Sequence, residues 1–254
     1  MSLNVGFIGL GNIGKPCANH LIRDGFVTRV FDVQTSQVQE LAAQGALACQ
    51  TIAEVAASSD HIGICVRDDQ QVEKVLYGVD GVFRHACGDT LVSIHSTVTR
   101  KAFLKWVNDG KEQEISVIDA AISGGAQGAE SGSLCYMVGG ALSDFDKAKP
   151  VFETSADKVI HAGDVGSGLL LKLCNNMITY AEFMAMSEAV KLAEEMAATE
   201  EAAPAEEAPA EAAPAEEAPV EEAPAEEEAP AEEAAPAEEA PEEEAPVEEA
   251  PAEE

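Results

Sequence analysis

Basic residues are scarce in this sequence, whose 254 residues include 15 Lys and Arg against 47 Asp and Glu and carry a formal net charge of −32. So acidic a chain repels nucleic-acid phosphates and anionic lipid head groups, and we therefore expect neither nucleic acid nor a membrane as a partner. No apolar run approaches the roughly 18 residues of a membrane span, and Met1 is not followed by a basic leader with an apolar centre. These absences favour a cytoplasmic protein.

Cysteine pairs of the CxxC type are also lacking. The six cysteines are spread between Cys17 and Cys174 and lie mostly inside apolar segments. Structural disulfides belong mainly to secreted proteins, and zinc sites show characteristic close spacings of their ligands. We therefore predict reduced cysteines and no metal site.

The last 56 residues, from Thr199 onward, contain no Leu, Ile, Phe, Trp, Cys or Gly and no basic residue. Apart from Thr199 they consist of Ala, Glu, Pro and Val, with 23 Glu and ten of the twelve prolines of the chain. Prolines interrupt helices at short intervals and the like charges repel, so residues 199–254 are predicted to form a disordered low-complexity tail. It could be an interaction tail for a basic partner or a solvated appendage.

Residues 1–163 alternate short β-branched apolar runs with helix-like segments, and residues 164–198 contain one long helix. This pattern predicts an α/β fold, a Rossmann-type doubly wound and mainly parallel sheet followed by that helix. Strands are expected at residues 4–8, 27–32, 61–66, 90–95, 116–119, 134–138 and 158–161. Helices are expected at residues 13–23, 36–44, 52–58, 70–76, 100–108, 145–152 and 169–198.

A GxGxxG pattern follows the first expected strand and opens the first expected helix. Glycines let the backbone turn tightly and approach a pyrophosphate, whose charge then lies at the positive end of the helix. Asp32 ends the next strand and would accept hydrogen bonds from the adenine ribose. Because no arginine follows it to bind a 2′-phosphate, this carboxylate favours NAD over NADP. A structural turn without a ligand is the alternative. The predicted dinucleotide contacts here are Gly9, Leu10, Gly11, Asn12, Ile13, Gly14 and Asp32.

Two further loops are expected beyond the carboxyl ends of strands, where doubly wound sheets bind their ligands. We predict that Val66 and Arg67 in one loop and Ser96 and Thr97 in the other contact the cofactor, with Ser96 on its nicotinamide side. His95 is a rival candidate for proton transfer, since histidine titrates near neutrality. Because it precedes an outward-facing serine on a strand, however, its side chain should point to the opposite face.

Ser123, Gly124 and Gly125 form a third candidate site. A serine hydroxyl together with two unhindered glycine amides can bind a carboxylate. A flexible loop between two strands is the alternative.

Lys172 lies on a polar stripe of the long helix, together with Asn175, Asn176 and Thr179. Leucines flank it, and the partial burial that they impose lowers the pKa of an amine and suits it to proton transfer near neutral pH. An asparagine one turn later could orient the lysine or hold the substrate. A surface lysine that extends its ammonium group into water is the alternative.

Together these motifs resemble the β-hydroxyacid dehydrogenase family over about residues 3–195. The matching segments are GFIGLGNIGKP at 6–16, FDV at 31–33, HSTV at 95–98, DAAISGG at 119–125, GSLCYMVGG at 132–140 and GSGLLLKLCNN at 166–176. The resemblance implies hydride transfer between nicotinamide C4 and the hydroxyl-bearing carbon of a small β-hydroxyacid, of the 3-hydroxyisobutyrate or the glycerate and tartronate semialdehyde type.

The resemblance also implies roles for individual residues. Lys172 would be the catalytic acid/base and Asn176 would assist it, while Ser123, Gly124 and Gly125 would bind the substrate carboxylate. A homodimer is implied as well, with a second, all-helical domain at the place where this sequence has residues 199–254.

Two functions therefore stay open. The first is an NAD-dependent β-hydroxyacid dehydrogenase. The second is a non-catalytic dinucleotide-binding module, left by loss of the second domain and carrying an acidic interaction tail. Binding of NAD without turnover would select the module.

Overall fold

The computed structural model describes residues 3–202, and side chains as far as Ala197. The strands are β1 (Asn4–Ile8), β2 (Val27–Phe31), β3 (Leu47–Ala48), β4 (His61–Ile64), β5 (Leu91–Ile94), β6 (Ser116–Ser123), β7 (Leu134–Gly139) and β8 (Ala156–Gly163). The helices are α1 (Gly14–Arg23), α2 (Thr35–Ala42), α3 (Ile52–Ala56), α4 (Asp69–Tyr77), α5 (Val82–His85), α6 (Arg100–Lys111), α7 (Gly125–Ser131), α8 (Leu142–Phe152) and α9 (Ser167–Ala202), with a 3-10 turn at Glu153–Ser155.

The strands form one sheet in the order β3-β2-β1-β4-β5-β6-β7-β8. Neighbours are parallel except β6 and β7, whose antiparallel register pairs Asp119 with Gly139 and Ser123 with Cys135. From β1 the chain winds outward to β3 and then returns to β4 on the other side of β1. This reversal of strand order creates a ligand crevice in doubly wound folds, and the predicted Rossmann-type, mainly parallel sheet is confirmed.

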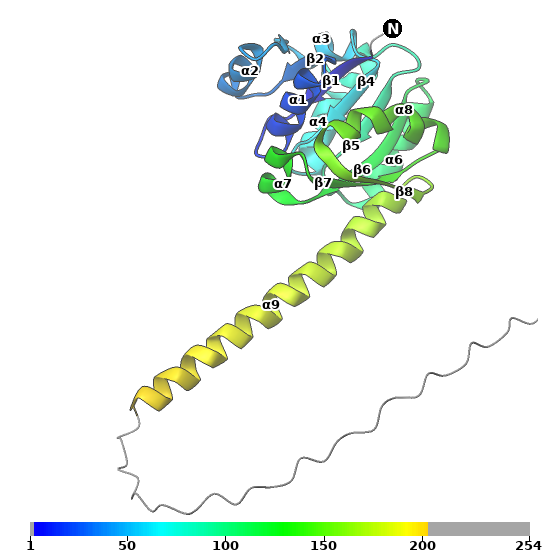
Figure 1. The fold of residues 1–254 in the computed structure, drawn as a ribbon. Helices are drawn as coiled ribbons and strands as arrows, with labels where there is room; N and C mark the ends of the chain where they lie inside the picture. The colour runs from blue at the N-terminus through cyan, green and yellow to red at the C-terminus, as the bar shows by residue number, and fades with distance from the viewer. Residues whose placement is uncertain (1–2, 203–254) are drawn as a thin grey trace, which may run out of the picture. The chain divides into compact units, whose positions relative to one another are not determined.

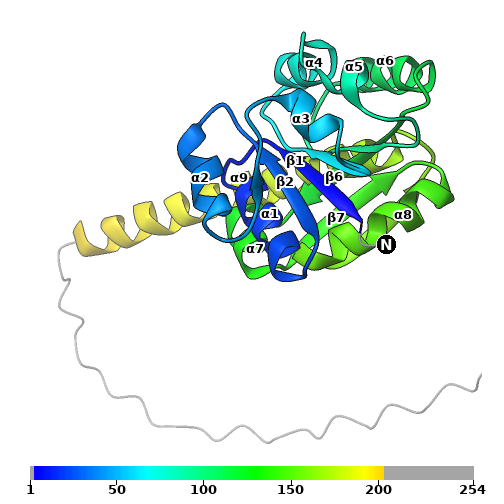
Figure 2. The same ribbon diagram turned by 90° about the horizontal axis from the view of Figure 1, so that it is seen from above.

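Helices cover both faces of the sheet, with α4, α5 and α6 on one side of the strands and α1, α7 and α8 on the other (Figure 2). Each layer follows from amphipathic helices that bury one stripe against the sheet. In α1 the buried stripe holds Cys17, Ala18 and Leu21. On the opposite face, α6 buries Phe103 and Trp106, so each face of the sheet has its own apolar core.

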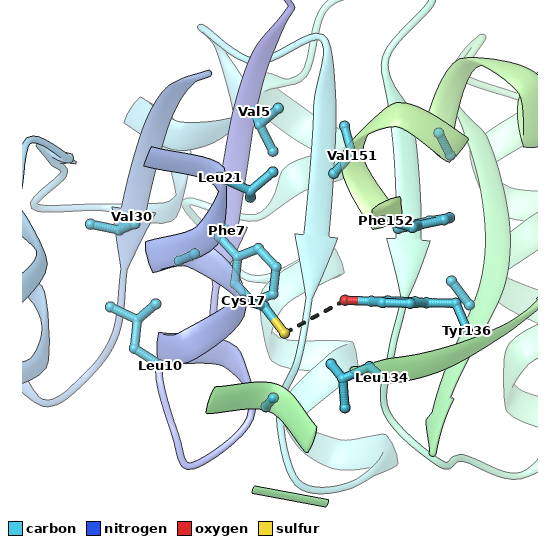
Figure 3. Packing of buried hydrophobic residues seen from close by; sticks show 14 of the residues in the cluster. Val5, Phe7, Leu10, Cys17, Leu21, Val30, Leu134, Tyr136, Val151 and Phe152 are labelled. Atoms are coloured by element: carbon cyan, nitrogen blue, oxygen red, sulfur yellow. Dashed lines mark hydrogen bonds between the residues drawn. The ribbon is translucent and has the colours of Figure 1, made fainter. Parts of the chain in front are cut away.

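Aromatic rings fill the core between β1, β7, α1 and α8 (Figure 3). Tyr136 stacks on Phe152 with ring centroids 4.7 Å apart. Its hydroxyl bonds the Ser155 hydroxyl at 2.9 Å and donates to Cys17 Sγ at 3.5 Å. All six cysteines are free thiols; Cys17 and Cys49 are buried as core residues, whereas Cys87 and Cys174 are exposed.

Strand β6 is longer than the predicted strand at 116–119. Its first half pairs with β5, and its second half continues to Ser123 because β7 pairs with it in antiparallel register. The short helix α7 follows directly, in a segment rich in Gly, Ala and Ser for which the sequence predicts no helix. Together β6 and α7 place Ser123 and the two glycines after it at a strand-to-helix turn.

Helix α9 contacts β6, β7 and β8 near its start and then runs away from the sheet (Figure 1). It ends at Ala202, four residues beyond the predicted end of the long helix at residue 198. The rest of the predicted tail, residues 203–254, lies outside the described residues. Large apolar side chains remain exposed along α9, namely Leu170, Leu171, Leu173, Met177, Ile178, Tyr180, Phe183, Met184, Met186, Val190, Leu192 and Met196.

Candidate functional site

The carboxyl ends of β1, β2, β4, β5 and β6 lie at one edge of the sheet, because these strands run parallel. Every predicted cofactor contact follows β1, β2, β4 or β5, and Ser123 is the last residue of β6. The structure therefore brings these candidates, which are up to 114 residues apart in the sequence, to the same edge.

The glycine-rich turn after β1 has room for a ligand at one of its glycines. Gly9 has a φ of +95°, and a Cβ there would overlap the Cys65 carbonyl oxygen. A Cβ on Gly14 would overlap the Gly9 carbonyl oxygen, whereas a Cβ on Gly11 would meet no described atom within 4 Å. Among the described residues, α1 has neither a side-chain N-cap nor an acidic residue in its first turn. The Lys15 N–H donates to the Gly11 carbonyl and Pro16 has no N–H, so what this turn offers an anion is the positive dipole end of α1, and a pyrophosphate fits there.

Asp32 is joined to the same turn. Its Oδ2 accepts the Leu10 N–H at 2.6 Å, and its Oδ1 accepts the Gln34 N–H at 2.7 Å. Each carboxylate oxygen can accept a second hydrogen bond. The two backbone bonds therefore orient the carboxylate and leave it able to accept ribose hydroxyls.

Ser96 connects the loops that follow β4 and β5. Its hydroxyl donates to the Val66 carbonyl at 2.7 Å and accepts the Val66 N–H at 3.1 Å. Ser96 is buried, whereas Thr97 and Arg67 beside it are exposed. The Ser96 hydroxyl thus holds two loops together at the cofactor edge, and the contacts of these four residues with the cofactor stay predictions.

His95 lies in the aromatic core on one face of the sheet, away from the Ser96 hydroxyl. Its Nδ1 is 2.9 Å from the Ala120 carbonyl oxygen, and its ring stacks on Phe7 at a centroid distance of 5.7 Å. Burial lowers the pKa of His95 to about 4. The ring is therefore neutral near pH 7 and enclosed by apolar groups, which argues against proton transfer by His95.

Ser123, Gly124 and Gly125 expose polar groups at the turn between β6 and α7. Gly124 has a φ of +127° and Gly125 a φ of +63°, a region of backbone conformation that glycine adopts without strain. Both glycines are exposed, and a Cβ on Gly125 would meet no described atom within 4 Å. The turn therefore offers a hydroxyl and accessible backbone amides, which are donors that suit a carboxylate.

Lys172 lies in the second turn of α9 and is half-buried. Burial lowers the pKa of its amine below the ordinary value, an effect that the neighbouring Cys135 thiol opposes. Among the described side chains, none forms an ion pair or a hydrogen bond with the Lys172 amine. The amine is therefore available to a substrate oxygen.

Asn175 carries the contact between α9 and the turn at Ser123. Its Nδ2 donates to Ser123 Oγ at 3.4 Å. The family resemblance pairs Lys172 with Asn176, which lies half-buried one turn further along the helix. Helical periodicity places both asparagines on the polar stripe, but it does not indicate which of them faces β6.

Within residues 3–202, no three His, Cys, Asp or Glu side chains are grouped in a way that could hold a metal ion. The same residues include no helix with the length and apolar character that crossing a membrane requires.

The family model for the NAD binding domain of 6-phosphogluconate dehydrogenase matches residues 4–163. The 2-(hydroxymethyl)glutarate dehydrogenase of Eubacterium barkeri is 36% identical over 191 residues, which cover 75% of this chain and 64% of that protein. The 3-hydroxyisobutyrate dehydrogenase of Pseudomonas aeruginosa is 32% identical over 189 residues, covering 74% of this chain and 63% of the relative.

A solved structure of Mycobacterium tuberculosis 3-hydroxyisobutyrate dehydrogenase with L-serine superposes with a TM-score of 0.72. Its sequence is 31% identical, and the match covers 78% of this chain and 67% of that chain. This chain thus spans somewhat less than two thirds of the length of the first two relatives. Residues 4–163, which form the sheet and its helices, are a nicotinamide dinucleotide-binding domain, and the chain belongs to the β-hydroxyacid dehydrogenase family.

Proposed function

We propose that this chain transfers a hydride between NAD and the hydroxyl-bearing carbon of a small β-hydroxyacid. The observation that carries the proposal is the hydrogen bond from Asn175 to Ser123, because it joins the helix of Lys172 to a turn suited to a carboxylate. A proton-transfer group and a carboxylate site then stand side by side at the cofactor edge of the sheet. Such a pair suits a substrate with a hydroxyl and a carboxylate a few bonds apart.

The names of the relatives support this substrate class. 2-(Hydroxymethyl)glutarate, 3-hydroxyisobutyrate and L-serine share a hydroxymethyl group on the carbon next to a carboxylate. We propose that the substrate has the same unit, as in 3-hydroxyisobutyrate or glycerate. We also expect a homodimer in the cytoplasm, as the family resemblance and the composition imply.

The residues that would hold the cofactor are those of the glycine-rich turn and its neighbours. The glycine-rich turn and the positive dipole end of α1 would bind the pyrophosphate, and Asp32 would accept the adenine ribose hydroxyls. The bound nicotinamide supplies the hydride acceptor or donor. The loops at Val66 and Ser96 follow the two strands next to β1 on the crevice side, and we propose that they line the nicotinamide half of the site.

Lys172 would move the proton. As a neutral amine it accepts the proton of the substrate hydroxyl while the hydride leaves the carbon that bears this hydroxyl. In the reverse direction the ammonium returns the proton to the carbonyl oxygen. Burial favours the neutral form by lowering the pKa of Lys172, which brings a lysine closer to the range where it can act as a general base. Ser123, Gly124 and Gly125 would hold the carboxylate, and Asn176 would assist the lysine from the next turn.

NAD rather than NADP is the proposed cofactor. A 2′-phosphate would meet the Asp32 carboxylate, whose position two backbone bonds already fix. A tenfold preference corresponds to about 1.4 kcal/mol, which one misplaced charge can supply. In a calorimetric titration NADH should bind more tightly than NADPH, and the opposite order would contradict the assignment.

The function is tested by following nicotinamide absorbance with NAD and a panel of β-hydroxyacids, beside calorimetric NAD binding to the same chain. We expect turnover with 3-hydroxyisobutyrate or glycerate and none with an α-hydroxyacid such as lactate, which matches the spacing of the site poorly. The alternative module is favoured by the exposed apolar side chains of α9, which leave the helix of Lys172 open to solvent. Binding of NAD without any turnover would select that module.

A further inference from the structure

Asp119 is a buried carboxylate that has no role in the proposed function. It lies on β6 in register with Ile94 of β5 and Gly139 of β7, and only 3% of the residue is exposed. Its Oδ1 accepts the Gly166 N–H at 2.7 Å, and its Oδ2 accepts the Leu169 N–H at 2.6 Å. Gly166 directly precedes α9 and Leu169 lies in its first turn, where backbone amides have no partner within the helix. Asp119 therefore caps α9 from a strand that lies 47 and 50 residues earlier in the sequence.

Close backbone packing leaves this junction little freedom. A Cβ on Gly139 would lie 2.5 Å from Asp119 Oδ1. A Cβ on Gly168, in the first turn of α9, would overlap the Met137 carbonyl oxygen of β7. The first turn of α9 thus lies directly on the backbone of β7, while Asp119 binds Leu169 in that turn and Gly166 just before it. Charge-assisted hydrogen bonds of this kind are roughly twice as strong as neutral ones.

The same two elements meet a second time further along. Asp119 and Ser123 are four residues apart on β6 and point to the same face, roughly 13 Å apart along an ideal strand. On α9, Leu169 and Asn175 are six residues apart, roughly 9 Å along an ideal helix. Asp119 bonds the helix at Leu169, and Ser123 bonds it at Asn175. Lys172 is the residue midway between these two attachment points.

We propose that Asp119 is a positioning residue for proton transfer, which fixes the start of α9 on β6 so that the Lys172 amine stands at the Ser123 turn. A helix held at Asn175 alone could tilt or slide about that contact, and the amine would then move relative to a carboxylate bound at Ser123. A misplacement of about 1 Å can lower a rate by about a hundredfold. This inference rests on the proposed function, which gives Lys172 its role.

Two substitutions in the full chain separate positioning from mere stabilisation of the fold. Asp119→Glu keeps both acceptor oxygens and the charge, but its extra methylene displaces the first turn of α9. Asp119→Asn keeps the shape of the side chain but replaces one acceptor oxygen by an NH2 group. The N–H of either Gly166 or Leu169 then faces a group that cannot accept its hydrogen bond. Asp146→Asn, which removes an exposed carboxylate from α8, is the matched control.

The readouts are kcat and KM for the β-hydroxyacid, the Kd for NADH, the unfolding midpoint and the pKa of Lys172. Carbon NMR of reductively dimethylated lysines gives that pKa, with Lys172→Arg to assign the signal. We expect Asp119→Glu and Asp119→Asn to lower kcat by about 10- to 100-fold, to leave the NADH Kd within about twofold, and to raise the Lys172 pKa as the amine gains water. The control should change none of these values.

A folded Asp119→Glu variant with the kcat and the Lys172 pKa of the parent chain would overturn the proposal. If the parent chain binds NADH without turnover, the proposed function fails, and the Lys172 pKa alone decides the positioning role: a raised value supports it and an unchanged value overturns it. If neither variant folds, Asp119 serves the fold alone, and the positioning role is likewise overturned.

Discussion

Lys172 is a cation that folding partly removes from water without giving it a partner among the described side chains. We predict that Lys172→Ala lowers kcat by about a hundredfold to ten-thousandfold, which is the usual contribution of a general acid or base. NAD affinity should stay unchanged, because the lysine acts on the substrate oxygen. Initial rates and calorimetric titration of the same preparations measure both quantities.

Lys191→Ala is the matched control, since Lys191 is an exposed lysine further along α9. It should keep both the rate and the affinity of the parent chain. Parental turnover in Lys172→Ala would show that solvent or another group moves the proton.

At the scale of single residues, the sequence predicts chemistry better than contacts. It indicates Lys172 as a partly buried amine, and Lys172 is half-buried, although the adjacent Leu171 and Leu173 are themselves exposed. It also predicts that His95 faces away from Ser96, since neighbouring strand residues point to opposite sides. It predicts neither the Asn175 contact with Ser123 nor the two hydrogen bonds that Asp119 accepts. In each case the partners are about 50 residues apart in the sequence, and the donors to Asp119 are backbone amides, which leave no sequence pattern.

In the turn between β1 and α1, glycine serves two separate purposes. A Cβ on Gly11 would meet no described atom, whereas a Cβ on Gly14 would overlap the Gly9 carbonyl oxygen. We predict that Gly11→Ala leaves the unfolding midpoint unchanged and weakens NADH binding at least tenfold, because its methyl group occupies the space where the pyrophosphate approaches. Thermal unfolding and calorimetric titration test the two effects.

Gly14→Ala provides the comparison. It should destabilise the fold itself by about 1–3 kcal/mol, as overpacked positions commonly do. Undiminished NADH binding by a folded Gly11→Ala variant would mean that the dinucleotide does not approach this turn.

The predicted elements differ from the structure where pairing over long distances sets their limits. Helix α1 follows from its local glycine pattern and its apolar stripe, and its observed start at Gly14 is within one residue of the prediction. Strand β6 extends four residues beyond its prediction because β7 pairs with residues 119–123. Helix α7 is missed because its Gly, Ala and Ser residues favour a loop by propensity alone, and because β7 rather than local sequence fixes the turn before it.

For the whole molecule, two buried histidines predict acid sensitivity. Burial lowers the pKa of His61 to about 3 and that of His95 to about 4. The charge that His95 gains on protonation lowers the pKa of His61 further. In the unfolded chain both titrate near their ordinary pKa of about 6.5. Below that pH the unfolded state binds protons that the folded state does not, so stability falls as the pH falls.

We predict that the free energy of unfolding decreases by about 2 kcal/mol for each of these histidines between pH 7 and pH 5. Urea unfolding at the two pH values measures the decrease. His95→Gln should reduce it by about half, whereas substitution of the exposed His85 by Gln should not. An equal decrease in His95→Gln would assign the acid sensitivity to other groups.

The proposed function depends most of all on the transfer of hydride from a β-hydroxyacid to a nicotinamide. The most direct measurement uses 3-hydroxyisobutyrate with deuterium on its hydroxyl-bearing carbon, NAD and the full chain, followed by mass spectrometry of the reduced cofactor. We predict that the NADH carries the deuterium and that Lys172→Ala forms it far more slowly. NADH without the label, or bound NAD that is never reduced by any β-hydroxyacid of the panel, would contradict the account.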